Sequence, residues 1–373
     1  MSFSQQLNKL NIDEIKHSIY SATDKDVENA LSASKVTAEN LAALLSPAAR
    51  KYLEPMASMA RALTISRFGK TIKIYAPLYL SNDCVNSCLY CGFNRTTHIP
   101  RITLTPDEIR REAEILSSMG IKNVILVSGD NRAAFSDEMI KDAVKICAQY
   151  FPMISVEVRT LPTETYAELR ECGADGLTVF QETYIKDSYA FLHPKGPKSN
   201  FEYRLDAPER AAAAGIRAIG MGALLGLEDF RTDVYIMCLH AKYIADKYYR
   251  SHVSASFPRI RASAGCFTPK NIVTDANIVQ AIGAFRLFLP DCGINISTRE
   301  PASFRDRLIH LGATIMSAGS KTEPGGYANA KEDAGQFHIE DSRSVEEFTE
   351  AVRLSGYDPV MKDWDSGFRD TVI

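Results

Sequence analysis

The sequence predicts an α/β protein: a full (β/α)8 barrel of the TIM type, with a helical N-terminal extension and a C-terminal closing segment. Three observations support this fold class. Eight short segments are apolar and rich in residues that favour strands, longer amphipathic segments alternate with them, and helix start and stop residues separate the two kinds. Regular alternation of strands and helices favours a parallel sheet, and eight such units close into a barrel.

The strand candidates are short and follow one another at intervals that leave room for a helix. The first is TIKIYAPLYLS at residues 71–81, and KNVILVSG at 122–129 follows it. The other six are 153–160, 175–183, 216–223, 252–259, 293–300 and 312–320.

The segments between these strands carry helix signals. TPDEIRREAEILSSMG has Thr105 as an N-cap, Pro106 in its first turn and Gly120 at its end, which are the residues that helix termini prefer. The same pattern recurs in LPTETYAELRECG, DAPERAAAAG, DVYIMCLHAKYIADKYY, DANIVQAIGAFRLFL and SFRDRLIHLG.

Three regions are expected along the chain. Residues 1–66 form a helical N-terminal extension, in which TDKDVENALSAS and TAENLAALLS each begin with a capping threonine. Residues 67–320 form the barrel. Residues 321–373 form a C-terminal segment that packs on the barrel, with one helix and a closing part that contains Trp364.

Composition and charge exclude several classes of protein. Of 373 residues, 45% are hydrophobic and 24% charged, and the net charge is −3. A charge so close to zero predicts no nucleic-acid partner. No apolar segment reaches the roughly 18 residues that span a bilayer, so no membrane association is expected. The N-terminal residues lack the apolar core of a signal peptide, and we therefore expect a cytoplasmic protein.

Cysteines indicate where the chemistry lies. Cys84, Cys88 and Cys91 fall in the spacing C-x3-C-x2-C directly after the first predicted strand, at the face where barrel enzymes place their active sites. Three thiolates can hold three irons of a [4Fe–4S] cluster and leave the fourth iron open to a ligand. A zinc site completed by His98 is the alternative. Five scattered cysteines are expected to be small buried hydrophobes: Cys147, Cys172, Cys238, Cys266 and Cys292.

The cysteine motif has an aromatic residue, Tyr90, before its third cysteine, and this pattern resembles the radical S-adenosylmethionine (SAM) superfamily, whose members use partial or full (β/α) barrels. Further motifs resemble one family in it, the ThiH family of 2-iminoacetate synthases (tyrosine lyases) of thiamine biosynthesis. These motifs run in order over nearly the whole chain: PLYLSNDCVNSCLYCGFN, QETY, MGALLGL, SFPRIR, STREPASFRDR, KTEPGGYA and KDWDS.

The resemblance implies a SAM site on the middle strands. Gly129 and Asp130 follow the second strand where the superfamily usually has a Gly-Gly-Glu turn, so Asp130 would accept hydrogen bonds from the SAM ammonium, or would only cap the turn. Glu157 would bind the SAM ribose. Glu157 and Arg159 alternate and are expected to share a strand face, so an internal ion-pair network is the alternative.

Other SAM contacts are expected on neighbouring strands. The resemblance makes Tyr90 a cofactor-binding residue. Arg204, in the loop after QETY, is a candidate for the SAM carboxylate, because arginine binds carboxylates through two hydrogen bonds. Gly222 in GMGALLG would let backbone approach the ligand closely.

Polar residues at the ends of the last three strands are expected to bind the amino-acid substrate. Arg299 is the first choice for its carboxylate, with Ser317 beside it, and Tyr79 on the first strand would orient the amine; rim salt bridges are the alternative. The residues expected to converge there are Arg259, Arg261, Ser297, Arg299, Glu300, Ser317 and Ser320.

The resemblance implies a [4Fe–4S] cluster and SAM as cofactors and L-tyrosine as substrate, cleaved between Cα and Cβ to 2-iminoacetate (dehydroglycine) and p-cresol. It also implies handover to thiazole synthase and a flavodoxin or ferredoxin as electron donor. Related enzymes remain alternatives: tryptophan lyase, and the hydrogenase-maturation tyrosine lyase, which carries further C-terminal cysteines, whereas no cysteine follows Cys292 here. A non-enzymatic metal or electron-transfer module is the alternative of another class.

Overall fold

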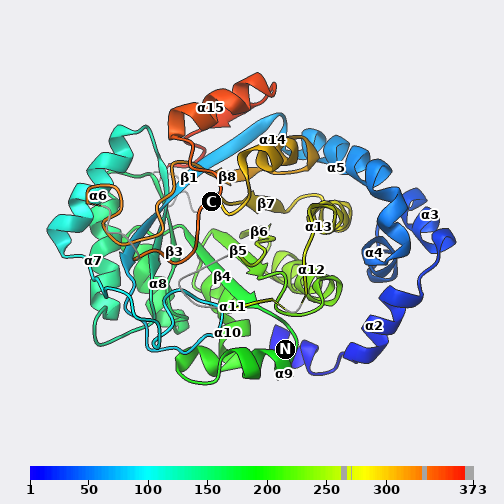
Figure 1. Cartoon of the computed structure of the whole chain (residues 1–373), viewed down its shortest axis with the longest axis horizontal. Coiled ribbons are helices and arrows are strands. Elements are labelled where there is room, and N and C mark those ends of the chain that lie inside the picture. Colours follow the sequence, from blue (N-terminus) through cyan, green and yellow to red (C-terminus); the bar gives the residue numbers. More distant parts are fainter. Residues whose placement is uncertain (262–266, 270, 330–333, 366–373) are drawn as a thin grey trace.

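The computed structural model describes residues 1–261, 267–269, 271–329 and 334–365. Its centre is a closed barrel of eight parallel strands with helices around it (Figure 1). Each strand lies within one of the eight predicted segments, so the predicted barrel is confirmed. The strands are β1 Thr71–Ser81, β2 Asn123–Ser128, β3 Met153–Glu157, β4 Gly176–Glu182, β5 Ala218–Ala223, β6 His252–Ser256, β7 Gly293–Ile296 and β8 Ile315–Ser317.

The first strand closes the barrel because it pairs on both sides. Residues 73–75 pair with β8, and residues 76–81 pair with β2 with one register shift. Strand β1 also separates two environments: Ile72, Ile74, Ala76 and Leu78 are fully buried and belong to the main apolar core. The alternate residues from Thr71 to Pro77 are only partly buried, and Tyr79 lines the interior cavity described below.

The first of the outer helices begins with the capping residues that the sequence predicted. Thr105 caps α6 through a capping box with Glu108, and Pro106 opens the helix. Helices α7, α9 and α10 lie outside the predicted helical segments. The helices around the barrel are α6 Pro106–Ser118, α7 Asp137–Cys147, α8 Thr163–Cys172, α9 Lys186–Leu192, α10 Phe201–Leu205, α11 Ala207–Ala213, α12 Phe230–Lys247, α13 Asp275–Phe288 and α14 Ala302–Leu311.

The N-terminal extension is helical, as predicted, and covers the side of the barrel formed by α12, α13 and α14 (Figure 1). Gln280 on α13 fixes it there by donating hydrogen bonds to the carbonyl oxygens of Leu44 and Ser46, at 3.0 and 2.8 Å. Its helices are α1 Phe3–Leu7, α2 Ile12–Ser21, α3 Asp24–Ser32, α4 Ala38–Leu45 and α5 Leu53–Phe68. None of the described helices is long and apolar enough to cross a membrane.

The C-terminal segment contains the predicted helix, α15 Val345–Leu354, and an additional short strand, β9 Asp358–Val360, that the sequence did not predict. Strand β9 pairs in parallel with residues 71–73 at the start of β1. Asn123 holds this end together, since its amide nitrogen donates to the carbonyl oxygens of Ile74 and Met361, at 2.8 and 2.9 Å. The tail is therefore attached to the amino-terminal end of the barrel.

Replacing Asn123 by alanine should destabilise the fold. Two carbonyl oxygens lose their donor, and each buried group left unsatisfied costs about 1–3 kcal/mol. Denaturant unfolding of Asn123→Ala should show a loss of this size, whereas the neighbouring Lys122→Ala should change stability by no more than about 0.5 kcal/mol. Equal stabilities of the two variants would show that the Asn123 side chain does not hold β9.

Candidate active site

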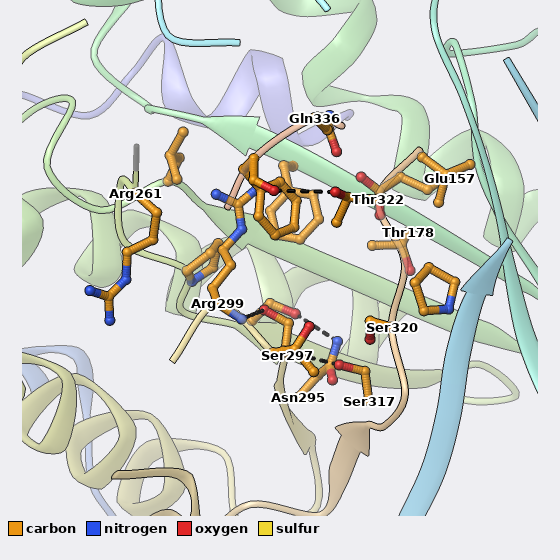
Figure 2. Close-up of a pocket in the computed structure, with 18 of the residues that line it drawn as sticks. Glu157, Thr178, Arg261, Asn295, Ser297, Arg299, Ser317, Ser320, Thr322 and Gln336 are labelled. Atoms are coloured by element: carbon orange, nitrogen blue, oxygen red, sulfur yellow. Dashed lines mark hydrogen bonds between the residues drawn. The ribbon is translucent and has the colours of Figure 1, made fainter. Parts of the chain in front are cut away.

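A cavity opens where the eight strands end, and Figure 2 shows many of the polar side chains that surround it. Every strand contributes a lining residue, either from the strand or directly after it. The lining residues with chemical function are Tyr79, Tyr90, Cys91, Glu157, Glu182, Lys198, Arg261, Asn295, Ser297, Arg299, Glu300, Ser317, Ser320 and Gln336.

The three cysteines lie in the loop that follows β1, as predicted. Cys88 is buried, while Cys84 and Cys91 are partly buried. The backbone turns tightly between Cys88 and Cys91, with the amide of Cys91 donating to the carbonyl oxygen of Cys88 at 3.2 Å. Burial raises the pKa of the Cys88 thiol to about 12, against the opposing effect of the Lys198 ammonium group.

Asn86 connects this loop to two others, and the sequence analysis missed it. Its amide nitrogen donates to the Asp130 carboxylate at 2.9 Å and to the Cys84 sulfur at 3.6 Å. Its amide oxygen accepts from the backbone of Lys198 at 2.9 Å. The Asn86 side chain is only 2% exposed, so a single buried amide holds the cysteine loop against the loops that follow β2 and α9.

The donor set fits an iron–sulfur cluster. Three thiols share one loop, and two of them accept hydrogen bonds: Cys84 from Asn86, and Cys91 from Gln336 at 3.9 Å. Hydrogen bonds to sulfur are one means by which proteins adjust such clusters. In the described part of the chain, no three His, Cys, Asp or Glu side chains surround a point closely enough for one ion. A four-iron cluster does not require this, because each thiolate binds a different iron.

The other cysteines lie mostly where the sequence predicted. Cys147, Cys238 and Cys292 are buried, Cys172 is partly buried, and Cys266 lies outside the described residues. His98, the predicted fourth ligand of the alternative zinc site, is exposed.

Gly129 and Asp130 lie against the cysteine loop. A Cβ atom at Gly129 would overlap the carbonyl oxygen of Asp83, so glycine is required there by the close approach of the two loops. Asp130 accepts the hydrogen bond from Asn86, and its carbonyl oxygen accepts one from Val85 at 3.0 Å. Asp130 thus has structural contacts in this loop and does not line the cavity.

Glu157 lies inside the cavity, whereas Arg159 does not. Burial, together with repulsion from Glu182, raises the pKa of Glu157 to about 7, although the guanidinium group of Arg299 acts in the opposite direction. The expectation that Arg159 shares its face is wrong: β3 ends at Glu157, and Arg159 turns away to bind Asp137 and the carbonyl oxygen of Phe135.

Glu182 forms a buried ion pair with Lys198, at 2.5 Å, and the sequence analysis did not predict Lys198. Burial opposes ionisation of Glu182, but Lys198 and Arg204 hold its pKa below the ordinary value. Glu182 has a φ of +73°, a conformation that side chains rarely adopt and that often marks functional sites. Arg204 stands behind this pair, donates to the carbonyl oxygen of Phe180 at 2.8 Å and does not line the cavity.

Tyr90 is held in one orientation at the cavity wall. The Nδ1 atom of His193 donates to the Tyr189 carbonyl oxygen at 2.8 Å, so Nε2 accepts from the Tyr90 hydroxyl at 2.7 Å. Burial lowers the pKa of His193 to about 3 and keeps the ring neutral. Lys198 lies 5.6 Å from the centre of the Tyr90 ring.

Gly222, on β5, is required by close packing. A Cβ atom there would lie 2.7 Å from the ring of Phe180 and 2.9 Å from the carbonyl oxygen of Ser256. In the structure, the absence of a side chain at Gly222 therefore allows the Phe180 ring to pack closely against it.

Arg299 lines the cavity, and its positive charge has no ion-pair partner in the part of the chain that the structure describes. Among the described residues, its guanidinium group has no hydrogen bond or ion pair; it stacks on the Phe337 ring at 3.5 Å. Burial lowers the pKa of Arg299, although the nearby Tyr79, Glu182 and Glu157 act in the opposite direction. The arrangement suits an anionic ligand.

The remaining residues predicted for the substrate lie nearby. Ser317 lines the cavity and its hydroxyl accepts from the backbone of Thr298 at 3.1 Å. Tyr79, on β1 next to β8, also lines the cavity and donates to the Gln336 side chain at 2.7 Å. Gln336 and Phe337 come from the C-terminal segment, where no recognisable motif could have indicated them.

The rim arginines are paired, unlike Arg299. Arg259 binds both carboxylate oxygens of Glu300, at 3.0 and 3.1 Å, and Arg261 binds the same group at 2.9 Å. Arg261 and Glu300 line the cavity, but Arg259 does not. For these two arginines the alternative of a rim salt bridge is correct.

Comparisons with known proteins agree with this site. Residues 78–234 match the radical SAM superfamily, and residues 256–358 match the Biotin and Thiamin Synthesis associated domain. The 2-iminoacetate synthases of Escherichia coli and Salmonella typhimurium are each 42% identical over 98% of this chain and 97% of their own. The crystal structure of HydG, a maturase of the [FeFe]-hydrogenase, has a TM-score of 0.87 and 33% identity, covering 94% of this chain and 80% of its own.

The barrel, the three-cysteine loop and the cavity beside it define a radical SAM enzyme that uses a [4Fe–4S] cluster and SAM. Within that superfamily, the chain belongs to the family of the 2-iminoacetate synthases.

Asn86→Ala should loosen the cysteine loop. The carboxylate of Asp130 and the backbone amide of Lys198 would lose their partner, so we expect unfolding to require about 1–3 kcal/mol less, and less iron to bind after anaerobic reconstitution. Iron per chain and denaturant unfolding measure the two effects. The exposed Asn8→Ala is the control, and an unchanged iron content in Asn86→Ala would contradict this role.

Glu157 should make stability depend on pH. Its pKa of about 7 in the folded state exceeds the ordinary value of 4.5, so the folded state holds the proton more tightly. The stability it contributes is complete below about pH 4.5 and is lost as the pH rises through about 7. Between pH 5 and 8, the Tm of the apoprotein should fall relative to that of Glu157→Gln, which cannot ionise.

The exposed Glu164→Gln serves as the control for this comparison and should follow the wild-type pH dependence. A Tm difference between wild type and Glu157→Gln that stays constant with pH would show that Glu157 ionises normally.

Proposed function

We propose that the chain cleaves the Cα–Cβ bond of L-tyrosine to give 2-iminoacetate and p-cresol, while SAM becomes methionine and 5′-deoxyadenosine. The product would supply the thiazole ring of thiamine. The observation that carries this proposal is the unpaired Arg299 guanidinium, enclosed in the same cavity as Cys91. End-to-end similarity to 2-iminoacetate synthases, at 42% identity, supports it.

Cys84, Cys88 and Cys91 would hold the cluster, which together with SAM would supply the radical chemistry that abstracts a hydrogen atom from the substrate amine. The chain's residues bind and orient the reactants. Tyr90, kept in place by His193, offers a rigid wall for SAM, and Glu157 would accept hydrogen bonds from the ribose hydroxyls. Arg204 would bind the SAM carboxylate after moving from the Phe180 carbonyl oxygen.

The contacts of Asp130 and Gly222 give these two residues structural roles in the proposed site. Asp130 keeps the loop beside SAM in shape through Asn86, and a contact with the SAM ammonium would need the carboxylate to exchange that partner. Gly222 keeps space for the Phe180 ring and so shapes the cavity wall.

On the substrate side, Arg299 would bind the tyrosine carboxylate, with the Ser317 hydroxyl beside it. Tyr79, oriented by Gln336, would receive the amine. Since the C-terminal segment carries Gln336 and Phe337, it also covers the mouth of the cavity and keeps water from the reactants.

The alternatives are less well supported. The hydrogenase maturase HydG is 33% identical, against 42% for the 2-iminoacetate synthases. A module without catalytic activity has no need of an enclosed cation that lacks an anion.

Partners follow from the chemistry of the product. 2-Iminoacetate hydrolyses readily in water, so we propose direct transfer to thiazole synthase in a complex. A flavodoxin or ferredoxin would provide the electron. The cytoplasm suits this chemistry because its reducing conditions keep the thiols available.

The proposed function is tested anaerobically. The reconstituted protein, with SAM, a reductant and tyrosine, should form p-cresol, glyoxylate from hydrolysis of 2-iminoacetate, and 5′-deoxyadenosine. The triple Cys84→Ala, Cys88→Ala, Cys91→Ala variant should form none of them. Cleavage of SAM without p-cresol from tyrosine would refute the proposed substrate.

Arg299→Ala should weaken tyrosine binding by roughly 3 kcal/mol or more, about 100-fold, because the carboxylate is left buried without a partner. Arg299→Lys should restore part of this loss, since lysine cannot form the two parallel hydrogen bonds. SAM binding and iron content should remain nearly unchanged.

Calorimetric titrations of SAM and of tyrosine, made separately, measure these effects. The exposed Arg307→Ala on α14 is the control. Loss of SAM binding with tyrosine affinity intact would place Arg299 in the cofactor site instead.

A further inference from the structure

Three polar side chains form a cluster inside the barrel, at the end of the cavity away from the Arg299 guanidinium. Asn295 on β7 donates to the Tyr75 hydroxyl at 3.1 Å and to the Ser256 hydroxyl at 3.2 Å. Ser256 and Asn295 are register partners on neighbouring strands, and Tyr75 comes from β1. All three line both the cavity and a second one beneath it in the barrel.

The cluster has an unused hydrogen-bonding position. The Oδ1 atom of Asn295 is buried and has no hydrogen-bond partner among the described residues. Leaving such a group unsatisfied costs free energy, so a ligand that satisfies it gains affinity. Because the hydroxyls of Tyr75 and Ser256 can either donate or accept, the amide can also turn over. In both orientations one polar atom remains for a ligand.

Apolar surfaces border this position. The Phe180 ring lies against Gly222, at the same level as Ser256, because residue 222 pairs with both 180 and 256 in the sheet. Ile125 on β2 also lines the cavity. An aromatic wall, an aliphatic side chain and an unsatisfied amide fit a planar ring that carries a hydroxyl group.

This position and the Arg299 guanidinium face different ends of the cavity. In Figure 2, Asn295 and Ser317 lie on one side of the Arg299 backbone, and its side chain extends away from them. The guanidinium group ends at Phe337, 3.5 Å from the ring. A ligand that reaches both ends needs an anion at one end and a hydroxyl group at the other.

We propose that Asn295, positioned by Tyr75 and Ser256, binds the phenol hydroxyl of the substrate and thereby selects tyrosine over phenylalanine. The inference rests on the proposed tyrosine cleavage and adds the specificity residue to it. A site built to hydrogen-bond a substrate hydroxyl discriminates strongly against the analogue without it, because the site's polar group is then left unpaired.

The test compares two amino acids on the reconstituted holoenzyme, kept anaerobic with S-adenosylhomocysteine in place of SAM. Calorimetry gives the affinities for tyrosine and phenylalanine, and their ratio is the readout. Asn295→Leu, of similar size, should lower tyrosine affinity tenfold or more and leave phenylalanine affinity unchanged or higher. Tyr75→Phe, which keeps the ring and removes one partner of Asn295, should reduce the ratio by a smaller factor.

Asn277→Leu makes the same change in the N-terminal cap of α13, outside the cavity, and should leave the ratio at its wild-type value. The proposal is overturned if Asn295→Leu and Tyr75→Phe keep the wild-type ratio, or if Asn295→Leu weakens both amino acids equally. Parallel assays with SAM separate this result from the function itself: wild-type protein that forms no p-cresol refutes the proposed cleavage, whereas p-cresol formation with a retained ratio refutes only the role of Asn295.

Discussion

The double pairing of β1 is the constraint on which the remainder of the structure depends. Residues 73–75 of this strand join β8 and residues 76–81 join β2, so one strand closes the barrel and brings eight strand ends around a common cavity. The same strand continues into the cysteine loop. Closure therefore determines both that a cavity exists and that the three thiols stand at its edge, a position that an open sheet would not provide.

The described charged side chains that line the cavity pair with one another in a way that leaves Arg299 without an anionic partner. Glu182 and Lys198 neutralise each other at 2.5 Å, and Arg261 is neutralised by Glu300 at the rim. Glu157 has its pKa raised to about 7, so near neutral pH it is partly protonated and offsets only part of the remaining positive charge. The anion that Arg299 lacks is thus expected from a ligand, and a carboxylate satisfies the requirement.

The C-terminal segment acts at both ends of the barrel. At the mouth, Gln336 contacts Tyr79 and Phe337 stacks on Arg299. At the other end, Asp363 pairs with Lys73 at 2.9 Å, and the Trp364 indole donates to Asp175 at 3.0 Å. The contacts of Gln336, Asp363 and Trp364 join residues more than 180 positions apart, so the segment belongs to the active enzyme although it lies beyond the last barrel strand.

The sequence by itself determined the eight strands, the three-cysteine loop and the position of Arg299 at the end of a strand. It could do so because these depend on local patterns: strand and helix alternation, cap residues and close cysteine spacing. Only the tertiary structure decided which charges remain unpaired. Arg259, Arg261 and Arg299 look alike in the sequence, yet Glu300 binds two of them, since partner choice depends on three-dimensional neighbours. Asn86, Asn295, Lys198, Gln336 and Phe337 were not predicted for the same reason: their partners lie on other strands and loops, and nothing in their local sequence specifies them.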